Sequence, residues 1–312
     1  MEKTLDVSII IVNYNTKELT RDCLKSVFEQ TDGIAFEVIV SDNGSTDGSQ
    51  EMIRAEFPQV VLIENGANIG FGAANNRALA VAKGKYVFYL NSDTVLLNNA
   101  VKIFYDYFEA HADEKLGAIG CNLLDVLKKP SPSSENFNGY WRIVKGQIGL
   151  LVRHDILAFI NLCHLQNIYI RIHERKSERC AYTPIYGEVD VIWGAALFLK
   201  NNTKALFDES FFLYVEETDL ELRLHNEGLK RILIAGPQIV HYEGKNVRYD
   251  SHAVSTFSVV CQQISLVRYA KKNLGKKYAF LLRVIILLDW MNPFVPKAAV
   301  KKALTLNGME RL

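Results

Sequence analysis

Three polar residues, Asn91, Ser92 and Asp93, directly follow the apolar segment YVFYL at 86–90. Such an apolar run predicts a buried strand. Asn, Ser and Asp at a strand end commonly form a turn, because their side chains bond the nearby backbone. A carboxylate with neighbouring amide and hydroxyl oxygens can equally hold a divalent cation and phosphate groups. The tripeptide alone leaves both interpretations open.

Glu216, Glu217 and Asp219 crowd the start of a predicted helix that ends at Gly228. Acids at a helix N-terminus are stabilised by the helix dipole, which gives a purely structural explanation. Helix capping requires fewer acids than the three that lie within these four residues, which follow an aromatic-rich segment. A carboxylate held there beside apolar rings could have the raised pKa of a general base.

His241 ends the apolar segment RILIAGPQIVHY at 231–242. A histidine after a strand is commonly a packed surface residue, but imidazole also joins carboxylates at divalent metals. Asp93 and His241 both lie at predicted strand ends. They are therefore candidates for a mixed oxygen and nitrogen metal site.

Strands and helices alternate along the first 120 residues. The predicted strands are 7–12, 36–42, 60–64 and 86–90, and the predicted helices are 16–30, with Thr16 as the cap, 48–57 and 73–84. This alternation predicts an α/β fold, with a parallel sheet covered by helices on both faces.

Four polar loops follow these strands, at 13–16, 41–49, 64–76 and 91–94. Ligands bind at the carboxyl ends of such strands. We therefore expect a ligand that is polar over most of its length.

Two of these loops have residues suited to a nucleotide. Asp42 could accept from a base N–H or a sugar hydroxyl, although an Asx turn with a helix cap at Asp47 explains it equally well. The stretch NIGFGAANN at 68–76 places two glycines before a helix whose free N–H groups could face a diphosphate. The glycine signal is weak, because neither GxGxxG nor GxxxxGK[ST] is present.

The second half is less regular. The segment 140–182 is rich in aromatic, His and Arg residues and is interpreted as an insertion that shapes a second pocket. A predicted strand pair at 188–200 is interrupted by Gly194, Ala195 and Ala196. Such small residues permit either the close approach of a ligand or simple tight packing.

Composition places the chain among ordinary globular proteins, with 312 residues, 49% hydrophobic content and a formal charge of +1. That charge gives no electrostatic indication of nucleic acid binding. Five widely spaced cysteines indicate reduced thiols rather than disulfides or zinc. The first apolar stretch is too short for a signal peptide, so we expect a cytoplasmic protein.

The C-terminal segment 265–305 interleaves Lys and Arg with Leu, Ile, Phe and Trp. Its longest apolar run is too short to cross a bilayer. Peripheral contact with an anionic membrane surface fits this pattern. An amphipathic helix packed on the catalytic domain, or a homodimer contact, fits it equally well.

The chain resembles the family 2 inverting glycosyltransferases of the GT-A fold, most closely a rhamnosyltransferase-like branch. The resemblance covers about residues 5–245 and rests on seven segments in the family's order: VSIIIVNYN, VIVSDNGSTDGS, NIGFGAANN, YLNSDT, WGAALFLK, FFLYVEETDLELRLHNEG and IVHYEGKN. It implies a GT-A catalytic domain at 1–245, with a donor-binding half at 1–121 and an acceptor and catalytic half at 122–245. Residues 246–312 would form a helical extension.

The resemblance also implies site residues. Asn91 to Asp93 stand at the family's DxD-type motif, so Asp93 would hold Mg²⁺ or Mn²⁺, with His241 as a further ligand. Glu217 would be the base that deprotonates the acceptor hydroxyl, with Glu216 and Asp219 beside it. Residues on the donor side would contact the nucleotide: Asn13, Asn15, Asp42, Asn68, Gly70, Asn75, Asn91 and Ser92.

Two residues depart from the family pattern. Asn91 replaces the first aspartate of DxD, which predicts reduced metal affinity rather than inactivity. Glu217 replaces the usual aspartate and is one methylene longer, which leaves the choice between Glu216 and Glu217 open.

The resemblance implies a metal-dependent transferase that moves a sugar from a nucleotide diphosphate donor, dTDP-rhamnose first and UDP-sugars next. The acceptor would be a glycan or a polyprenyl-linked molecule in surface polysaccharide synthesis. Two alternatives are a sugar nucleotidyltransferase, which usually has a Gly- and Arg-rich loop where this chain has NYNTKE, and a non-catalytic glycan-binding scaffold.

Overall fold

The computed structural model describes residues 5–112, 114–137, 139, 141–150, 152, 182–242, 256–291, 295 and 297–307. These residues form two compact units. The first unit holds the described residues up to 137, 184–212 and 216–242, and the second holds the remainder, including 213–215. Each unit is described separately.

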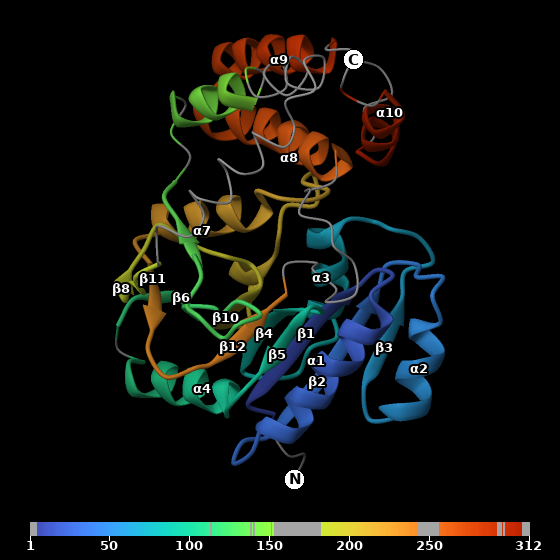
Figure 1. The fold of residues 1–312 in the computed structure, drawn as a ribbon. Coiled ribbons are helices and arrows are strands. Elements are labelled where there is room, and N and C mark those ends of the chain that lie inside the picture. Colours follow the sequence, from blue (N-terminus) through green and yellow to red (C-terminus); the bar gives the residue numbers. More distant parts are fainter. Residues whose placement is uncertain are drawn as a thin grey trace. The chain divides into compact units, whose positions relative to one another are not determined.

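The first unit is built around an eight-stranded sheet (Figure 1). In sheet order its strands are β3 (Val61–Glu64), β2 (Phe36–Asp42), β1 (Val7–Asn13), β4 (Tyr86–Asn91), β10 (Ala196–Lys200), β6 (Leu116–Cys121), β11 (Lys230–Ile234) and β8 (Gly187–Glu188). The strands from β3 to β4 are parallel, whereas β10 runs antiparallel to β4 and β6. The predicted α/β fold with a mostly parallel sheet is confirmed.

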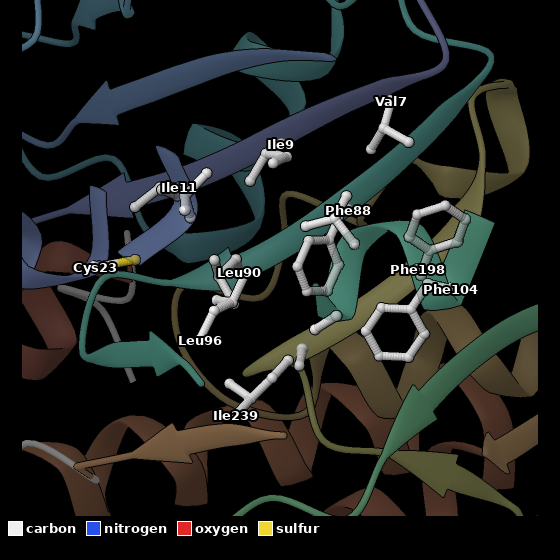
Figure 2. Packing of buried hydrophobic residues seen from close by; sticks show 14 of the residues in the cluster. Val7, Ile9, Ile11, Cys23, Phe88, Leu90, Leu96, Phe104, Phe198 and Ile239 are labelled. Carbon is white, nitrogen blue, oxygen red and sulfur yellow. The ribbon is translucent and has the colours of Figure 1, made fainter. Parts of the chain in front are cut away.

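Helices cover both faces of this sheet, because successive side chains of its central strands are apolar and point to opposite faces. Val7, Ile9 and Ile11 of β1 pack with α1 (Lys17–Gln30) and α4 (Ala100–Ala110) on one face. Ile10 points to the other face, toward α3 (Phe71–Leu79) and α7 (Glu216–Asn226). Figure 2 shows the first of these layers, with Phe88, Phe104 and Phe198 packed together.

The carboxyl ends of the parallel strands lie at one edge, as the sequence predicts. The last residue of β1, Asn13, is in register with Asp42 of β2, and Asp42 is in register with Glu64 of β3. On the other side of β1, Val12 is in register with Asn91 of β4. The four polar loops therefore start at the same edge of the sheet. The short helix α2 (Ser49–Glu56) follows the loop after β2.

Two small strand pairs add to this unit. β5 (Thr94–Leu96) pairs antiparallel with β12 (Ile239–His241), with Thr94 opposite His241. β7 (Ser134–Glu135) pairs antiparallel with β9 (Val191–Ile192). The first pair fixes where the chain returns from residue 241 to the end of β4.

The second unit is helical in its described part. It contains helical residues 141–150, α8 (Thr256–Tyr269), a π-helical turn (Ala270–Leu274), α9 (Lys276–Met291) and α10 (Lys297–Leu306). None of the helices described here is long and apolar enough to cross a bilayer. The predicted insertion at 140–182 lies mostly outside the described residues, and so do Cys163 and Cys180. Cys23, Cys121 and Cys261 are buried and free.

Candidate active site

The turn after β4 is held by backbone bonds on both sides. The backbone N–H of Asn91 donates to the carbonyl of Ala195 at 3.0 Å, and the Thr94 hydroxyl donates to the carbonyl of Asn91 at 2.7 Å. The amide oxygen Oδ1 of Asn91 is buried and has no hydrogen-bond partner among the described residues. Buried polar atoms without partners are rare, so this oxygen is available to a ligand.

Asp93 and His241 face each other. The Asp93 Oδ1 atom lies 3.3 Å from His241 Nε2, and the two side chains are 15% and 12% exposed. The antiparallel pairing of β5 with β12 brings them together, and the backbone N–H of Tyr242 donates to the carbonyl of Asp93 at 2.9 Å. The sequence placed both residues at strand ends, and the structure brings those ends into contact.

The donor atoms at this point fit an open cation site. A carboxylate, an imidazole and the Asn91 amide oxygen belong to neighbouring positions of the same turn and strand pair. Within the described ranges, no group of three or more His, Cys, Asp or Glu side chains could hold a metal. Mg²⁺ is usually held by one or two carboxylates plus substrate phosphates, so a sparse protein shell is expected for it.

Asn13 is the centre of a hydrogen-bond network that joins three loops. Its amide nitrogen donates to Asp42 at 2.7 Å and to Ser45 at 3.0 Å, and its amide oxygen accepts from Thr16 and Thr20. Thr16 stands at the N-cap of α1, as predicted, but its hydroxyl donates to the Asn13 amide oxygen and makes no side-chain capping bond.

Asn15 and Ser92 extend this network to the surface. Asn15 is exposed, has a left-handed backbone with φ 54°, and accepts the backbone N–H of Thr46 at 2.8 Å. The buried Ser92 hydroxyl lies 3.1 Å from the hydroxyl of Thr16. The loop after β1 is thereby joined to the loops after β2 and β4.

Asp42 is fully buried and its carboxylate accepts four hydrogen bonds from this chain. The donors are Asn13 at 2.7 Å, the backbone N–H groups of Gly44 and Ser45 at 3.1 and 2.9 Å, and Gln50 at 2.7 Å. Its observed role is therefore to shape the loop after β2. Contact with a base would require one of these bonds to be exchanged, and that contact stays a prediction.

The glycine loop before α3 packs against protein backbone. Gly70 has φ 93°, and a Cβ on it would lie 2.6 Å from the carbonyl oxygen of Phe212. The backbone N–H of Phe71 donates to that same carbonyl at 2.9 Å. Gly70 therefore allows this loop to pack closely against Phe212, and the predicted contact of the helix N-terminus with a diphosphate stays a prediction.

Two amides of the same loop and helix are also used within the chain. Asn68 accepts the backbone N–H of Gly70 at 3.1 Å, and the buried Asn75 donates to the carbonyl of Phe71 at 3.1 Å. Their predicted contacts with ribose and diphosphate stay predictions.

Glu217 lies in the first turn of α7, against Gly194. A Cβ on Gly194 would lie 3.7 Å from the Cβ of Glu217, and Glu217 Oε2 is buried without a hydrogen-bond partner in the described part of the chain. Burial raises the pKa of Glu217 to about 7. A carboxyl with this pKa can exchange a proton near neutral pH.

Gly194 also connects Glu217 to the turn after β4. Its neighbour Ala195 accepts the backbone N–H of Asn91, so the β9–β10 connection touches both Asn91 and Glu217. A Cβ at Gly194 would meet Glu217 only at an ordinary van der Waals distance, so the packing here is close but does not itself require glycine.

The other two predicted acids have different surroundings. Glu216 is 3% exposed, and burial followed by the neighbouring charge of Glu217 raises its pKa well above the usual range. Asp219 is buried and lies 3.4 Å from the Arg223 Nε atom, one turn along the same helix. The contact with Gly194 therefore favours Glu217 over Glu216 as the base, and Asp219 is part of an ion pair.

Glu221 is a buried acid that the sequence reasoning missed. Both of its carboxylate oxygens accept the backbone N–H of Ile192, at 3.0 and 2.8 Å, and burial raises its pKa well above the usual range. It therefore fixes β9 to α7 on the same side as Glu217. The signal was the spacing of four residues between Glu217 and Glu221, which puts both on one helical face.

A parallel sheet with polar loops at its carboxyl edge, a carboxylate–imidazole pair and a buried acid of raised pKa define an α/β enzyme of the GT-A type. The family model described as Glycosyl transferase family 2 matches residues 8–158. Residues 8–158, just under half of the chain, are therefore similar to the family 2 glycosyltransferases.

Individual relatives agree with this assignment. An N-acetylglucosaminyl-diphospho-decaprenol L-rhamnosyltransferase of Mycobacterium tuberculosis is 24% identical, over 68% of each chain. A poly(ribitol-phosphate) beta-glucosyltransferase of Bacillus spizizenii is 33% identical over 37% of this chain and 19% of its own length. The chain spans between 19% and 50% of the length of four of the curated relatives it matches.

Solved structures show the same fold. The mannosyltransferase PcManGT of Pyrobaculum calidifontis, in complex with GDP-Man and Mn²⁺, matches with a TM-score of 0.51 and 15% identity, over 99% of this chain and 87% of that chain. At this identity the likeness concerns the fold alone.

Proposed function

We propose that the protein transfers a glycosyl group from a nucleoside diphosphate sugar to a hydroxyl of a glycan or lipid-linked acceptor, with inversion at the anomeric carbon. The observation that carries this proposal is the Asp93–His241 contact of 3.3 Å, at the carboxyl edge of the sheet. In α/β sheets this edge is where nucleotides bind.

Asp93 and His241, with the buried oxygen of Asn91, are the groups that would hold Mg²⁺ or Mn²⁺. The chemistry such a cation supplies is neutralisation of the charge that builds on the departing diphosphate. The Mn²⁺ complex of the Pyrobaculum mannosyltransferase supports this assignment for the fold.

Glu217 is the residue to which we assign the proton of the acceptor hydroxyl. The acceptor oxygen attacks the anomeric carbon as the bond from that carbon to the diphosphate oxygen breaks, and the proton passes to the Glu217 carboxylate. Inversion follows because attack and departure occur on opposite faces of the sugar. No covalent bond to the protein is required.

We place dTDP-L-rhamnose first among donors and UDP-hexoses next, and we place the reaction in surface polysaccharide synthesis. The support comes from relatives named as a rhamnosyltransferase acting on a diphospho-decaprenol acceptor and as a poly(ribitol-phosphate) glucosyltransferase. The sugar that this protein transfers is identified by the donor panel described next.

The test is a panel of nucleotide sugars with Mn²⁺, Mg²⁺ or EDTA, in which nucleotide diphosphate release is measured with and without glycan acceptors. We expect metal-dependent release with one class of donor. Binding of nucleotide sugars without release under any condition, unchanged in Glu217→Gln, would favour the non-catalytic scaffold instead.

A further inference from the structure

Helix α9 has two apolar faces rather than one. Its inner face is buried within the second unit and consists of Ala279, Leu282, Ile286 and Trp290. Its outer face is exposed and consists of Phe280, Leu281, Val284, Leu287, Leu288 and Met291. These six residues are called the outer face of α9 below.

The spacing shows that the outer face is a continuous stripe. Positions 280, 284, 287, 288 and 291 recur at intervals of three and four residues, as they do on one side of a helix. Phe280 is 66% exposed, Leu288 52% and Met291 75%. The solvent side of a surface helix is normally charged or polar, so an apolar stripe of this length requires a partner surface.

The charged side chains in the described part of the second unit are almost all basic. The only acid among its described residues is Asp289, which is buried and accepts a hydrogen bond from Gln263 at 2.9 Å. The basic residues of its C-terminal helices are Arg268, Lys271, Lys272, Lys276, Lys277, Arg283, Lys297, Lys301 and Lys302. Lys276 and Lys277 are exposed at the first turn of α9, next to the outer face.

Two occupants could cover an apolar face with basic neighbours. In a twofold dimer the same patch meets itself, so both copies would bring lysines to the contact, and the described part of this unit offers no exposed acid to pair with them. An anionic bilayer supplies apolar chains and negative headgroups together. Charge complementarity therefore favours the lipid surface.

We propose that the outer face of α9 docks on the surface of an anionic phospholipid bilayer, with Lys276, Lys277 and Arg283 at headgroup level. The helix lies in the interface, since none of the described helices can span a bilayer. An interfacial helix buries its apolar face by roughly 5–10 Å, and nearby Lys and Arg strengthen binding to anionic lipid. This docking does not depend on the transfer chemistry proposed above.

The experiment is sedimentation of the full chain with vesicles of phosphatidylcholine alone or mixed with phosphatidylglycerol. Three variants are compared with wild type: Phe280→Ser/Leu288→Ser, Lys276→Glu/Lys277→Glu, and the control Leu127→Ser. Leu127 is 70% exposed and belongs to the first unit. Thermal unfolding of each variant verifies that it is folded.

We expect wild type and Leu127→Ser to bind the anionic vesicles, with binding that falls as salt is raised. Each double variant should lose at least about tenfold in vesicle affinity, because it removes buried apolar area or adds repulsion from the headgroups. Donor-dependent nucleotide release in solution should be unchanged in all three variants.

Two results would overturn the proposal. One is equal vesicle binding by wild type and both double variants, or equal binding to neutral and anionic vesicles. The other is a dimeric wild type by light scattering that Phe280→Ser/Leu288→Ser converts to monomers, without vesicle binding by either protein.

Discussion

Asp42 and Glu217 are both acids of the catalytic unit, but their surroundings differ. Asp42 is fully buried, and four donors of this chain bond its carboxylate. Glu217 has a buried oxygen without a described partner, and its pKa is raised to about 7. The carboxylate in the donor-side loop is thus hydrogen-bonded within the chain, whereas the one at the start of α7 keeps an oxygen without a described partner.

The different surroundings of the two carboxyl groups predict a structural role for Asp42 and a reactive role for Glu217. A carboxylate that accepts several hydrogen bonds is stable as an anion and holds its loop in place. A carboxyl with a buried oxygen that lacks a hydrogen-bond donor favours its protonated form and can take up and release a proton near neutral pH. We infer that the donor-side loops use most of their polar atoms within the chain, apart from the Asn91 amide oxygen, whereas Glu216 and Glu217 of α7 each keep one buried carboxylate oxygen without a described partner.

The largest expected effect is that of Glu217→Gln. The substitution preserves the shape of the side chain and removes its ability to accept a proton. We expect kcat to fall by about 10²- to 10⁴-fold, with donor affinity unchanged. Steady-state kinetics with calorimetry of donor binding measures both. A kcat within threefold of wild type would exclude Glu217 as the base, and Glu216→Gln provides the matched control.

Asp93→Asn and His241→Ala test the metal assignment. Each removes one of two groups that lie 3.3 Å apart. Loss of an outer partner of a metal ligand typically costs 10–100-fold in affinity, and we expect at least about that loss here. A titration of activity with Mn²⁺ gives the apparent affinity. Identical Mn²⁺ curves for wild type and both variants would contradict the assignment.

Asp42→Ala tests whether the Asp42 carboxylate stabilises the loop after β2. It removes the acceptor of four donors, of which the Asn13 amide and the Ser45 backbone N–H are buried, and each unsatisfied buried group costs about 1–3 kcal/mol, so we expect a loss of at least about 2 kcal/mol in unfolding free energy. Urea unfolding at pH 7 measures this loss. Asp32→Ala, at an exposed aspartate, should change it by less than about 0.5 kcal/mol. A loss for Asp42→Ala no larger than that of this control would refute the scaffold role.

Glu221 should show the smallest effects. Glu221→Gln retains an acceptor for the backbone N–H of Ile192 and mimics the protonated carboxyl that burial favours. We expect stability close to wild type for Gln and a further loss of about 1–3 kcal/mol for Ala, which leaves that N–H unsatisfied. Equal unfolding free energies for the two variants would show that the bond contributes nothing.

The periodicity of the sequence was sufficient to predict β1 to β4, the helices between them and the shared edge of the four loops, but it did not predict β5, α4 or β6. Asp93 and His241 could be paired in prediction because each ends a strand, and strand ends gather at sheet edges. These features depend on local pattern and on rules of connection, which a sequence carries directly.

Side-chain environments depended on contacts that the sequence could not specify. Gly70 meets the backbone of Phe212, which lies far along the chain, so its packing role could not be read from the loop itself. The Asp42 carboxylate accepts hydrogen bonds from several donors, including the Gln50 amide, whose orientation follows from the fold. The i to i+4 spacing of Glu217 and Glu221 was visible, but their burial was not.

The most direct test of the account is the pH dependence of kcat/KM for wild type and Glu217→Gln at saturating metal. Glu217 must lose its proton to act as a base, and burial raises its pKa to about 7. The rate should therefore rise as pH increases through about 7 and level off above it. We predict this ascending limb in wild type and its loss in Glu217→Gln. A wild-type profile that is flat between about pH 5.5 and 8 would contradict the central claim.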